Sequence, residues 1–189
     1  MAAPYPEPLR VAFVPGVTPG KWQRVWRDRR PRGRLDLIPL NQDAALAALT
    51  DGTAHMALLR DVAAADERWH AIPLYREAPV VVAPKGSLVA GLDSVSLAEL
   101  GGLDDVVVLT VDLHGGTGSD AIELVAANVG VAVMPQSVAR THSRKDVVAR
   151  PVTDGVGTSI SLVWPAAGAH SMVEEFIGIV RGRTANSSR

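Results

Sequence analysis

Short apolar runs of strand length alternate with stretches of helical period along the first part of the chain. The first of these runs is closed by Pro15-Gly16, and the run Val80-Val81-Val82 lies within a longer extended stretch. The expected strands of this part cover residues 9–14, 35–40, 55–59 and 72–84. Because strands and helices alternate here, we expect a parallel sheet with crossover helices.

Capping residues mark where the helices of this part begin. Thr18 stands before Pro19, which predicts an N-cap followed by proline at the first helical position. Asn41 can cap a helix over residues 42–50, and Gly52 lies just beyond the expected end of that helix.

Two further helix starts are indicated by capping-box spacing. Ser96 and Glu99 are three residues apart, and so are Ser171 and Glu174 at the start of the closing helix. The apolar face of that closing helix is formed by Val173, Phe176, Ile177 and Val180. From Gly182 onward the sequence predicts a frayed polar tail.

The middle of the chain repeats the alternation of strand and helix. We expect strands over residues 105–111, 131–134, 146–152 and 160–164, and helices over residues 119–127 and 136–142. The glycine-rich turn His114-Gly-Gly-Thr-Gly118 precedes the first of these helices. No internal repeat and no low-complexity linker divides the chain.

Composition narrows the class of protein. The chain has 189 residues, a formal net charge of −1 and no cysteine. This size supports a sizeable core without disulfides or metals, and the missing cysteines fit a reducing cytoplasm. No secretory signal precedes residue 10, and the apolar runs are too short to span a membrane. We therefore expect a soluble cytoplasmic protein without a strong general attraction to nucleic acid or membranes.

The turn after the first strand is the first candidate ligand site. A helix N-terminus offers unpaired backbone N–H groups and a partial positive charge, which favour an anion. Gly16 opens the turn, Thr18 adds a hydroxyl, and Lys21 adds a positive charge. An ordinary helix cap is the alternative interpretation.

The glycine-rich turn is the second candidate. Its members His114, Gly115, Gly116, Thr117 and Ser119 could bring backbone N–H groups close to an oxyanion. The spacing matches neither of the two common nucleotide-binding motifs, GxxxxGK[ST] and GxGxxG. With Asp112 it faintly resembles the phosphoribosyl-pyrophosphate loop, although a plain strand-to-helix turn remains an alternative.

Charged residues elsewhere give a weaker signal. Arg60 and Asp61 lie at the end of the expected third strand, where ligands gather in α/β sheets, but solvation of this pair is the favoured interpretation. The same alternatives hold for Tyr75, which lies near the first expected crossing between lobes. A basic run with interleaved Trp22 and Trp26 covers residues 21–34. The two tryptophans are explained by a buried helical face, so this run predicts a charged outer face, with an acidic partner or nucleic acid as the alternatives.

The sequence contains few arrangements of residues that could catalyse a reaction. The five histidines show no metal-ligand spacing, and no GxSxG elbow supplies a nucleophile. We therefore expect no catalytic residues, no metal and no cofactor.

The order of segments resembles the effector-binding domains of LysR-type regulators. The matching segments are Leu9-Arg-Val-Ala-Phe-Val-Pro-Gly16, residues 49–61, residues 73–88 with 96–100, and Glu123-Leu-Val-Ala-Ala-Asn-Val-Gly-Val-Ala-Val-Met-Pro135. The resemblance implies an α/β type 2 periplasmic-binding-protein fold of two lobes joined by two crossing strands. It implies lobe I over 8–80 and 155–183, lobe II over 81–154 and a disordered tail over 184–189. It also assigns Thr18 to a ligand-contacting position.

Two departures from the family pattern qualify that resemblance. The segment between residues 100 and 129 is short, which predicts a shortened second lobe. Few residues precede the first strand, so the family's winged helix-turn-helix has no counterpart here. The initial Met-Ala-Ala-Pro favours a naturally short protein that does not read DNA alone.

These observations leave three hypotheses. The leading one is a non-enzymatic module that binds a small anionic effector between its lobes and acts through lobe closure. The resemblance implies a homodimer, or a mixed dimer with a full-length regulator. The alternatives are a phosphoribosyl-transferase-like enzyme that uses the Gly-Thr-Gly turn, and an interaction protein without a ligand.

Overall fold

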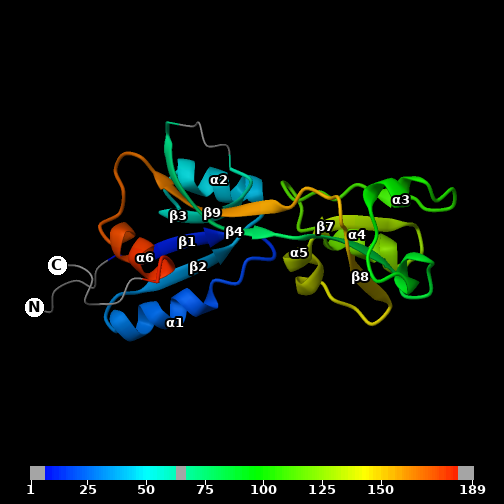
Figure 1. Ribbon diagram of the computed structural model, residues 1–189. Coiled ribbons are helices and arrows are strands. Elements are labelled where there is room, and N and C mark those ends of the chain that lie inside the picture. The colour runs from blue at the N-terminus through cyan, green and yellow to red at the C-terminus, as the bar shows by residue number, and fades with distance from the viewer. Residues whose placement is uncertain (1–6, 63–66, 183–189) are drawn as a thin grey trace, which may run out of the picture.

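Two β-sheets divide the chain into two lobes in the computed structural model, which describes residues 7–62 and 67–182 (Figure 1). Lobe I holds a five-stranded sheet in the order β2-β1-β3-β9-β4. Its strands are β1 (Leu9–Phe13), β2 (Leu35–Pro39), β3 (Met56–Arg60), β4 (Trp69–Glu77) and β9 (Thr158–Pro165). The first three strands are parallel, and β9 runs antiparallel to both β3 and β4.

Lobe II holds a four-stranded sheet in the order β6-β7-β5-β8. Its strands are β5 (Pro79–Pro84), β6 (Val108–Leu109), β7 (Val131–Pro135) and β8 (Val147–Pro151). Strand β6 is parallel to β7, and β5 is antiparallel to both of its neighbours.

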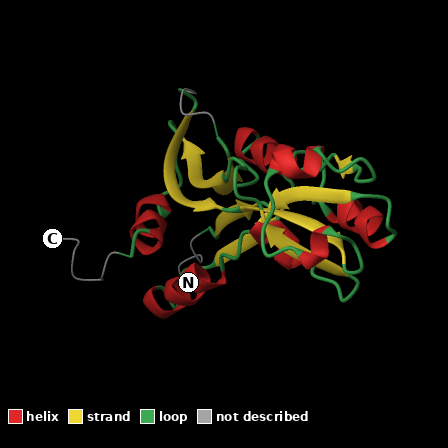
Figure 2. Ribbon diagram, turned by 45° about the vertical axis from the view of Figure 1, so that its right-hand side comes forward, coloured by secondary structure: helices red, strands yellow, loops and turns green. Residues whose placement is uncertain are grey.

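Helices cover the sheets of both lobes (Figure 2). Lobe I carries α1 (Gly20–Arg29), α2 (Gln42–Thr50) and α6 (Val173–Val180). Lobe II carries η1 (Val89–Gly91), α3 (Leu97–Gly101), α4 (Ser119–Ala126) and α5 (Gln136–Thr141). Within the described residues, no helix has the length and apolar character needed to cross a bilayer.

The chain crosses between the lobes twice. Strand β4 belongs to the first sheet and β5 to the second, with Ala78 alone between them. The return runs from β8 to β9 through residues 152–157. The two-lobed α/β architecture is therefore as predicted.

Each lobe has its own hydrophobic core. Trp26 and Phe176 pack edge to face in the core of lobe I, with ring centroids 6.0 Å apart. In lobe II, Val80 and Val82 face one cluster of buried residues and Val81 faces another. Strand β5 is thus covered on both sides, which explains its uninterrupted valine run.

Three local predictions were wrong. Helix α1 begins at Gly20 with Pro19 as N-cap and no side-chain cap, because the carbonyl of Pro19, and not that of Thr18, accepts the first helical bond. Helix α6 begins at Val173 after Met172 and lacks a Ser171 cap.

The reason for the second error lies at His170. Its Nδ1 accepts from the backbone N–H of Met172 at 3.2 Å, and its carbonyl accepts from that of Val173 at 3.0 Å. The N–H of Val173, one of the two that a Ser171 cap could bind, is therefore already bonded to His170. The strand expected over 105–111 shrinks to Val108–Leu109, because the rest of that segment does not pair with β7. Most of the predicted tail lies outside the described residues.

Candidate functional site

Residues of both lobes line a cavity of about 260 Å³. Lobe I contributes Arg60, the last residue of β3, and Gln42, the first residue of α2, so these walls come from the carboxyl ends of parallel strands. The full lining is Gln42, Arg60, Asp61, Val111, Leu113, His114 and Thr158. A molecule in this cavity would touch both lobes.

Arg60 lines the cavity beside Asp61, and the side chain of Arg60 is only 6% exposed. Its Nε donates to Oε2 of Glu77 at 2.7 Å, and its Nη2 donates to the carbonyl of Pro15 at 2.9 Å. Its Nη1 is buried and has no hydrogen-bond partner among the described residues. A buried donor without an acceptor is costly, so this nitrogen favours a ligand that brings an acceptor.

The backbone of Arg60 is held by the side chain of Gln42. The amide nitrogen of Gln42 donates to the carbonyl of Arg60 at 2.6 Å, and the backbone N–H of Arg60 donates to Oε1 of Gln42 at 3.0 Å. This reciprocal pair fixes the end of β3 and with it the base of the guanidinium side chain. The prediction that Arg60 is solvated was therefore wrong.

Glu77 joins the two lobes through one carboxylate. Besides Arg60, it accepts from Oγ1 of Thr158 at 2.8 Å and from the hydroxyl of Ser137, which lies in α5 of lobe II. Burial raises the pKa of Glu77, but the hydrogen bonds from Arg60, Ser137 and Thr158 and the charge of Arg60 outweigh it. The pKa of Glu77 therefore lies below its ordinary value.

A second cavity, of about 330 Å³, lies beside the same ion pair. It is lined by Gly16, Thr18, Lys21, Trp22, Tyr75 and Ser137. The ammonium of Lys21 lies 4.7 Å from the centre of the Trp22 ring. Burial raises the pKa of Tyr75, and the charge of Glu77 raises it further against the opposing effect of Arg60. This cavity therefore offers hydroxyl and ammonium donors to an anion.

Gly16 brings the lobes into direct contact at this cavity. Its φ is +89°, and a Cβ built on it would lie against the hydroxyl of Ser137 and 3.0 Å from the backbone nitrogen of Val138. A left-handed backbone and a close approach both require glycine here.

The glycine-rich turn of lobe II is folded around its own carboxylate. Oδ1 of Asp112 accepts from the backbone N–H groups of His114 and Gly115, at 2.9 and 3.0 Å. These two N–H groups are therefore already bonded and are not free to bind a diphosphate. The carbonyls of the same two residues accept instead from Asn41 and Asp43 of lobe I.

The predicted site residues fall into three groups: those that line the second cavity, those that line the first cavity, and those that line neither. The second cavity includes Gly16, Thr18, Lys21 and Tyr75. The first cavity includes Arg60 and His114. Neither lining includes Gly115, Gly116, Thr117 or Ser119.

Sequence reasoning missed Gln42, Glu77, Ser137 and Thr158. A buried acidic residue in the expected strand over 72–84 was the available signal for Glu77. Its partners Ser137 and Thr158 lie 60 and 81 residues away, so no local pattern pointed to them.

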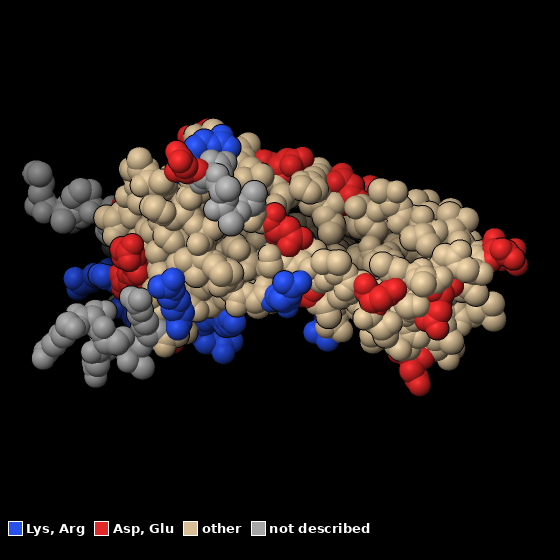
Figure 3. Space-filling view, turned by 45° about the horizontal axis from the view of Figure 1, so that its top comes forward, with Lys and Arg blue, Asp and Glu red and all other residues tan. Residues whose placement is uncertain are grey.

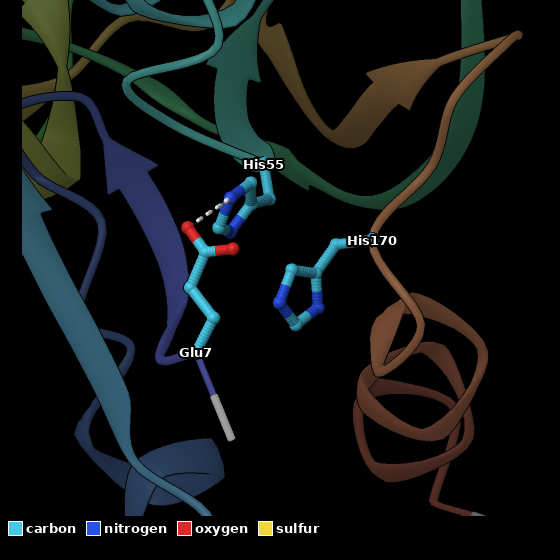
Figure 4. Close-up of side chains that lie close together, drawn as sticks. All are labelled: Glu7, His55 and His170. Carbon is cyan, nitrogen blue, oxygen red and sulfur yellow. Dashed lines mark ion pairs between the residues drawn. The ribbon is translucent and has the colours of Figure 1, made fainter. Parts of the chain in front are cut away.

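A separate cluster forms at the opposite pole of lobe I, where Glu7, His55 and His170 place possible ligand atoms within 4.8 Å of one another (Figure 4). The guanidinium of Arg10 already lies there, 3.0 Å from Oε1 of Glu7 and 2.9 Å from Nε2 of His55. Nδ1 of each ring faces a backbone N–H, that of Arg10 for His55 and that of Met172 for His170. A divalent metal would have to displace Arg10, so this cluster fits a metal poorly.

Comparison with solved structures shows which proteins share this fold. The effector-binding domain of a BenM variant aligns with a TM-score of 0.75 at 17% identity, covering 93% of each chain. The BenM effector-binding domain with its effector benzoate gives 0.73 at 17% identity, over 93% of this chain and 94% of that one. A mutant OxyR regulatory domain from Pseudomonas aeruginosa gives 0.72 at 18% identity, over 94% and 95%.

The sequence was also compared with protein-family models and with curated proteins. No curated protein matches the chain. The family model described as the LysR substrate binding domain matches residues 5–110 and 105–185, which is nearly the whole chain. The chain therefore belongs to the LysR substrate-binding domain family.

Proposed function

We propose that this chain binds a small-molecule effector between its lobes and acts as a regulatory binding module, not as an enzyme. The observation that carries the proposal is Arg60, which lines a cavity walled by both lobes and whose buried Nη1 lacks an acceptor among the described residues. A ligand that touches both lobes has a higher affinity for the closed arrangement and shifts the population toward it. The hinge of this motion lies at Ala78 and at residues 152–157.

The ligand class follows from the walls of the cavity. About 260 Å³ is close to the lower limit for small-molecule sites, so the effector is small. Val111 and Leu113 offer an apolar surface, and Arg60 offers a charged donor that pairs well with a carboxylate. We therefore propose a small carboxylate with an apolar body, a class that includes the benzoate in the BenM structure.

The second cavity extends the site toward α1. There Thr18, Lys21 and Tyr75 present a hydroxyl, an ammonium and a phenol beside the Arg60–Glu77 pair. We assign this cavity to a second anionic group, either of the same ligand or of another one.

The test is isothermal titration of benzoate into the wild type and two variants. Arg60→Met alone would leave Glu77 buried without a partner, so the double variant Arg60→Met/Glu77→Gln is used, because it removes both charges. We expect the double variant to lose affinity at least about tenfold while melting as cooperatively as the wild type. Lys21→Gln, which removes the ammonium group of the second cavity, is the control variant.

Equal benzoate affinity in the wild type and the double variant would contradict the assignment of Arg60. If neither benzoate nor a panel of carboxylates binds, and the chain instead co-purifies with another protein, the alternative of a ligand-free interaction protein gains support.

We also propose a homodimer with complementary charges. On the face shown in Figure 3, most Lys and Arg side chains lie over lobe I, whereas lobe II shows mainly Asp and Glu. Helix α1 exposes Arg24 and Arg27, and α4 exposes Glu123 beside the 46% exposed Leu124. Two copies that pair α1 of one with α4 of the other would match these charges twice in a two-fold arrangement.

Light scattering tests this pairing. Arg27→Glu should weaken the dimer, and adding Glu123→Arg should restore it. A monomeric wild type at high concentration would contradict the homodimer and leave a mixed dimer with a full-length regulator.

A further inference from the structure

The turn formed by residues 112–116 of lobe II reaches across the cleft to the N-terminus of α2 in lobe I. Its shape is set within lobe II, because the Asp112 carboxylate holds the backbone N–H groups of His114 and Gly115. The carbonyl oxygens of His114 and Gly115 accept from lobe I, which is the other side of the cleft.

Asn41 serves both lobes at once. Its Oδ1 accepts from the backbone N–H of Ala44 at 2.8 Å, which makes it the N-cap of α2. Its Nδ2 donates to the carbonyl of Gly115 at 2.7 Å. Beside it, the backbone N–H of Asp43 donates to the carbonyl of His114 at 3.2 Å. The turn therefore satisfies a first-turn N–H group of α2 that has no partner within its own helix.

The turn forms part of the wall of the Arg60 cavity. His114 belongs to both the turn and the cavity wall. At the hinge, the lobes are joined through Ser137 and Glu77. The cavity thus lies between the hinge and the turn, and separation of the lobes breaks the two hydrogen bonds to Asn41 and Asp43 first.

We propose that the turn of residues 112–116 is the gate of the inter-lobe cavity and that Asn41 is its latch. The bonds from Asn41 Nδ2 and from the Asp43 N–H hold the gate shut without ligand, and the Asn41 bond lies at an exposed site where breaking it costs little. Release of Asn41 then widens the opening through which a ligand enters and leaves. The role of the gate in ligand exchange rests on the proposed function, whereas the latch itself is a property of the ligand-free chain.

Asn41→Asp separates the two roles of this residue. An aspartate retains the acceptor for the Ala44 N–H and caps a helix as well as asparagine does. It replaces the donor Nδ2 by an oxygen that repels the Gly115 carbonyl, so the latch is lost while α2 remains capped. Asn41→Ser is a second variant, because serine also caps but is too short to reach Gly115.

Asn128→Asp is the matched control. It makes the same chemical change at an exposed residue of lobe II that lines neither cavity. The φ of Asn128 is +60°, a conformation that aspartate tolerates as asparagine does. We expect this variant to behave as the wild type.

The first readout is the distance between the lobes in the ligand-free protein. The sequence has no cysteine, so spin labels attach only at introduced sites, Thr50→Cys in lobe I and Leu88→Cys in lobe II. Pulsed dipolar spectroscopy with an excess of unlabelled protein reports single chains. We expect Asn41→Asp and Asn41→Ser to increase the population of longer distances about five- to tenfold. Distance distributions that match the wild type in both variants would overturn the gate.

The second readout is the exchange of benzoate, followed by stopped-flow or NMR line shape. We expect benzoate to dissociate about five- to tenfold faster from Asn41→Asp than from Asn128→Asp. If the distances change but benzoate binds to no variant, the latch stands and the ligand assignment fails. Unchanged dissociation despite changed distances would overturn the role of the gate in ligand exchange.

Discussion

The guanidinium of Arg60 and the carboxylate of Glu77 form a buried ion pair, with Nε and Oε2 2.7 Å apart, at the junction of the two lobes. Arg60 ends β3 and Glu77 ends β4, and β9 lies between these strands in the sheet. The pair therefore spans a strand, and Thr158 at the start of that strand also donates to Glu77. The first connection between the lobes follows Glu77, and the return connection ends at Thr158, which donates to Glu77.

Loss of one partner of this pair should destabilise the protein strongly. Glu77→Ala leaves the Arg60 charge buried without compensation, and we expect the free energy of unfolding to fall by about 3–5 kcal/mol. Urea unfolding followed by circular dichroism measures the change. The exposed pair of Arg144 and Asp146, at 2.8 Å, is the control, and Asp146→Ala should cost much less because water screens this pair. Equal effects of the two substitutions would contradict a buried, coupled pair.

Stability should also fall in acid because of Glu77. Its pKa in the folded protein lies below the value of 4.5 for the unfolded chain, so its stabilising contribution is complete above that value. The contribution is lost as the pH falls through the lower pKa of the folded state, when the carboxylate becomes protonated. Urea unfolding between pH 7 and pH 3 should show this loss. Glu77→Gln should be less stable at pH 7 and should have a flatter pH profile than the wild type, and parallel profiles would exclude Glu77 as the source.

Gly16 should not tolerate alanine, for two separable reasons. Its φ of +89° disfavours any side chain, and an added Cβ would press against Ser137 and Val138 of lobe II. Gly52 has a φ of +77° with open space around it, so Gly52→Ala measures the backbone strain alone, about 1–2 kcal/mol. Gly20→Ala, at the start of α1 with open space and no positive φ, should be neutral or stabilising. We expect Gly16→Ala to cost more than Gly52→Ala in thermal unfolding, and an equal cost would mean that the lobes yield easily at this contact.

The pole of lobe I opposite the cleft should respond to mild acid. Burial lowers the pKa of His55, and the positive charges of Arg10 and His170 lower it further against the raising effect of Glu7. A histidine with a depressed pKa stabilises the fold above its unfolded value of 6.5, and that stability is lost as the pH falls through the folded pKa. The ring of His55 is stacked on that of His170, with centroids 4.3 Å apart (Figure 4). The difference between the melting temperatures at pH 7.5 and pH 5.5 should therefore be smaller in His55→Gln than in the wild type. A difference as large as that of the wild type would assign the acid sensitivity to other groups.

Local signals in the sequence determined several elements correctly. Asn41 caps α2 over residues 42–50 as expected, and Ser96 and Glu99 form the predicted capping box. The valine run of residues 80–82 and the proline-ended run 131–135 form the neighbouring strands β5 and β7. Such signals are sufficient to predict these elements, because each depends on a few neighbouring residues. This holds for a helix cap, for a glycine that ends a helix and for the alternation of side chains along a strand. The order of these elements also indicated the family correctly.

Tertiary structure alone decided how the lobes meet. The residues next to Arg60 in the sequence led to the prediction that it is solvated. The fold instead buries it against Glu77, 17 residues further along. Asn41 donates to a carbonyl 74 residues away, and the glycine-rich turn uses its N–H groups on Asp112 and not on a ligand. A side chain's partner across a cleft depends on how two separately packed cores are placed. That placement is encoded by the whole chain, not by residues near either partner.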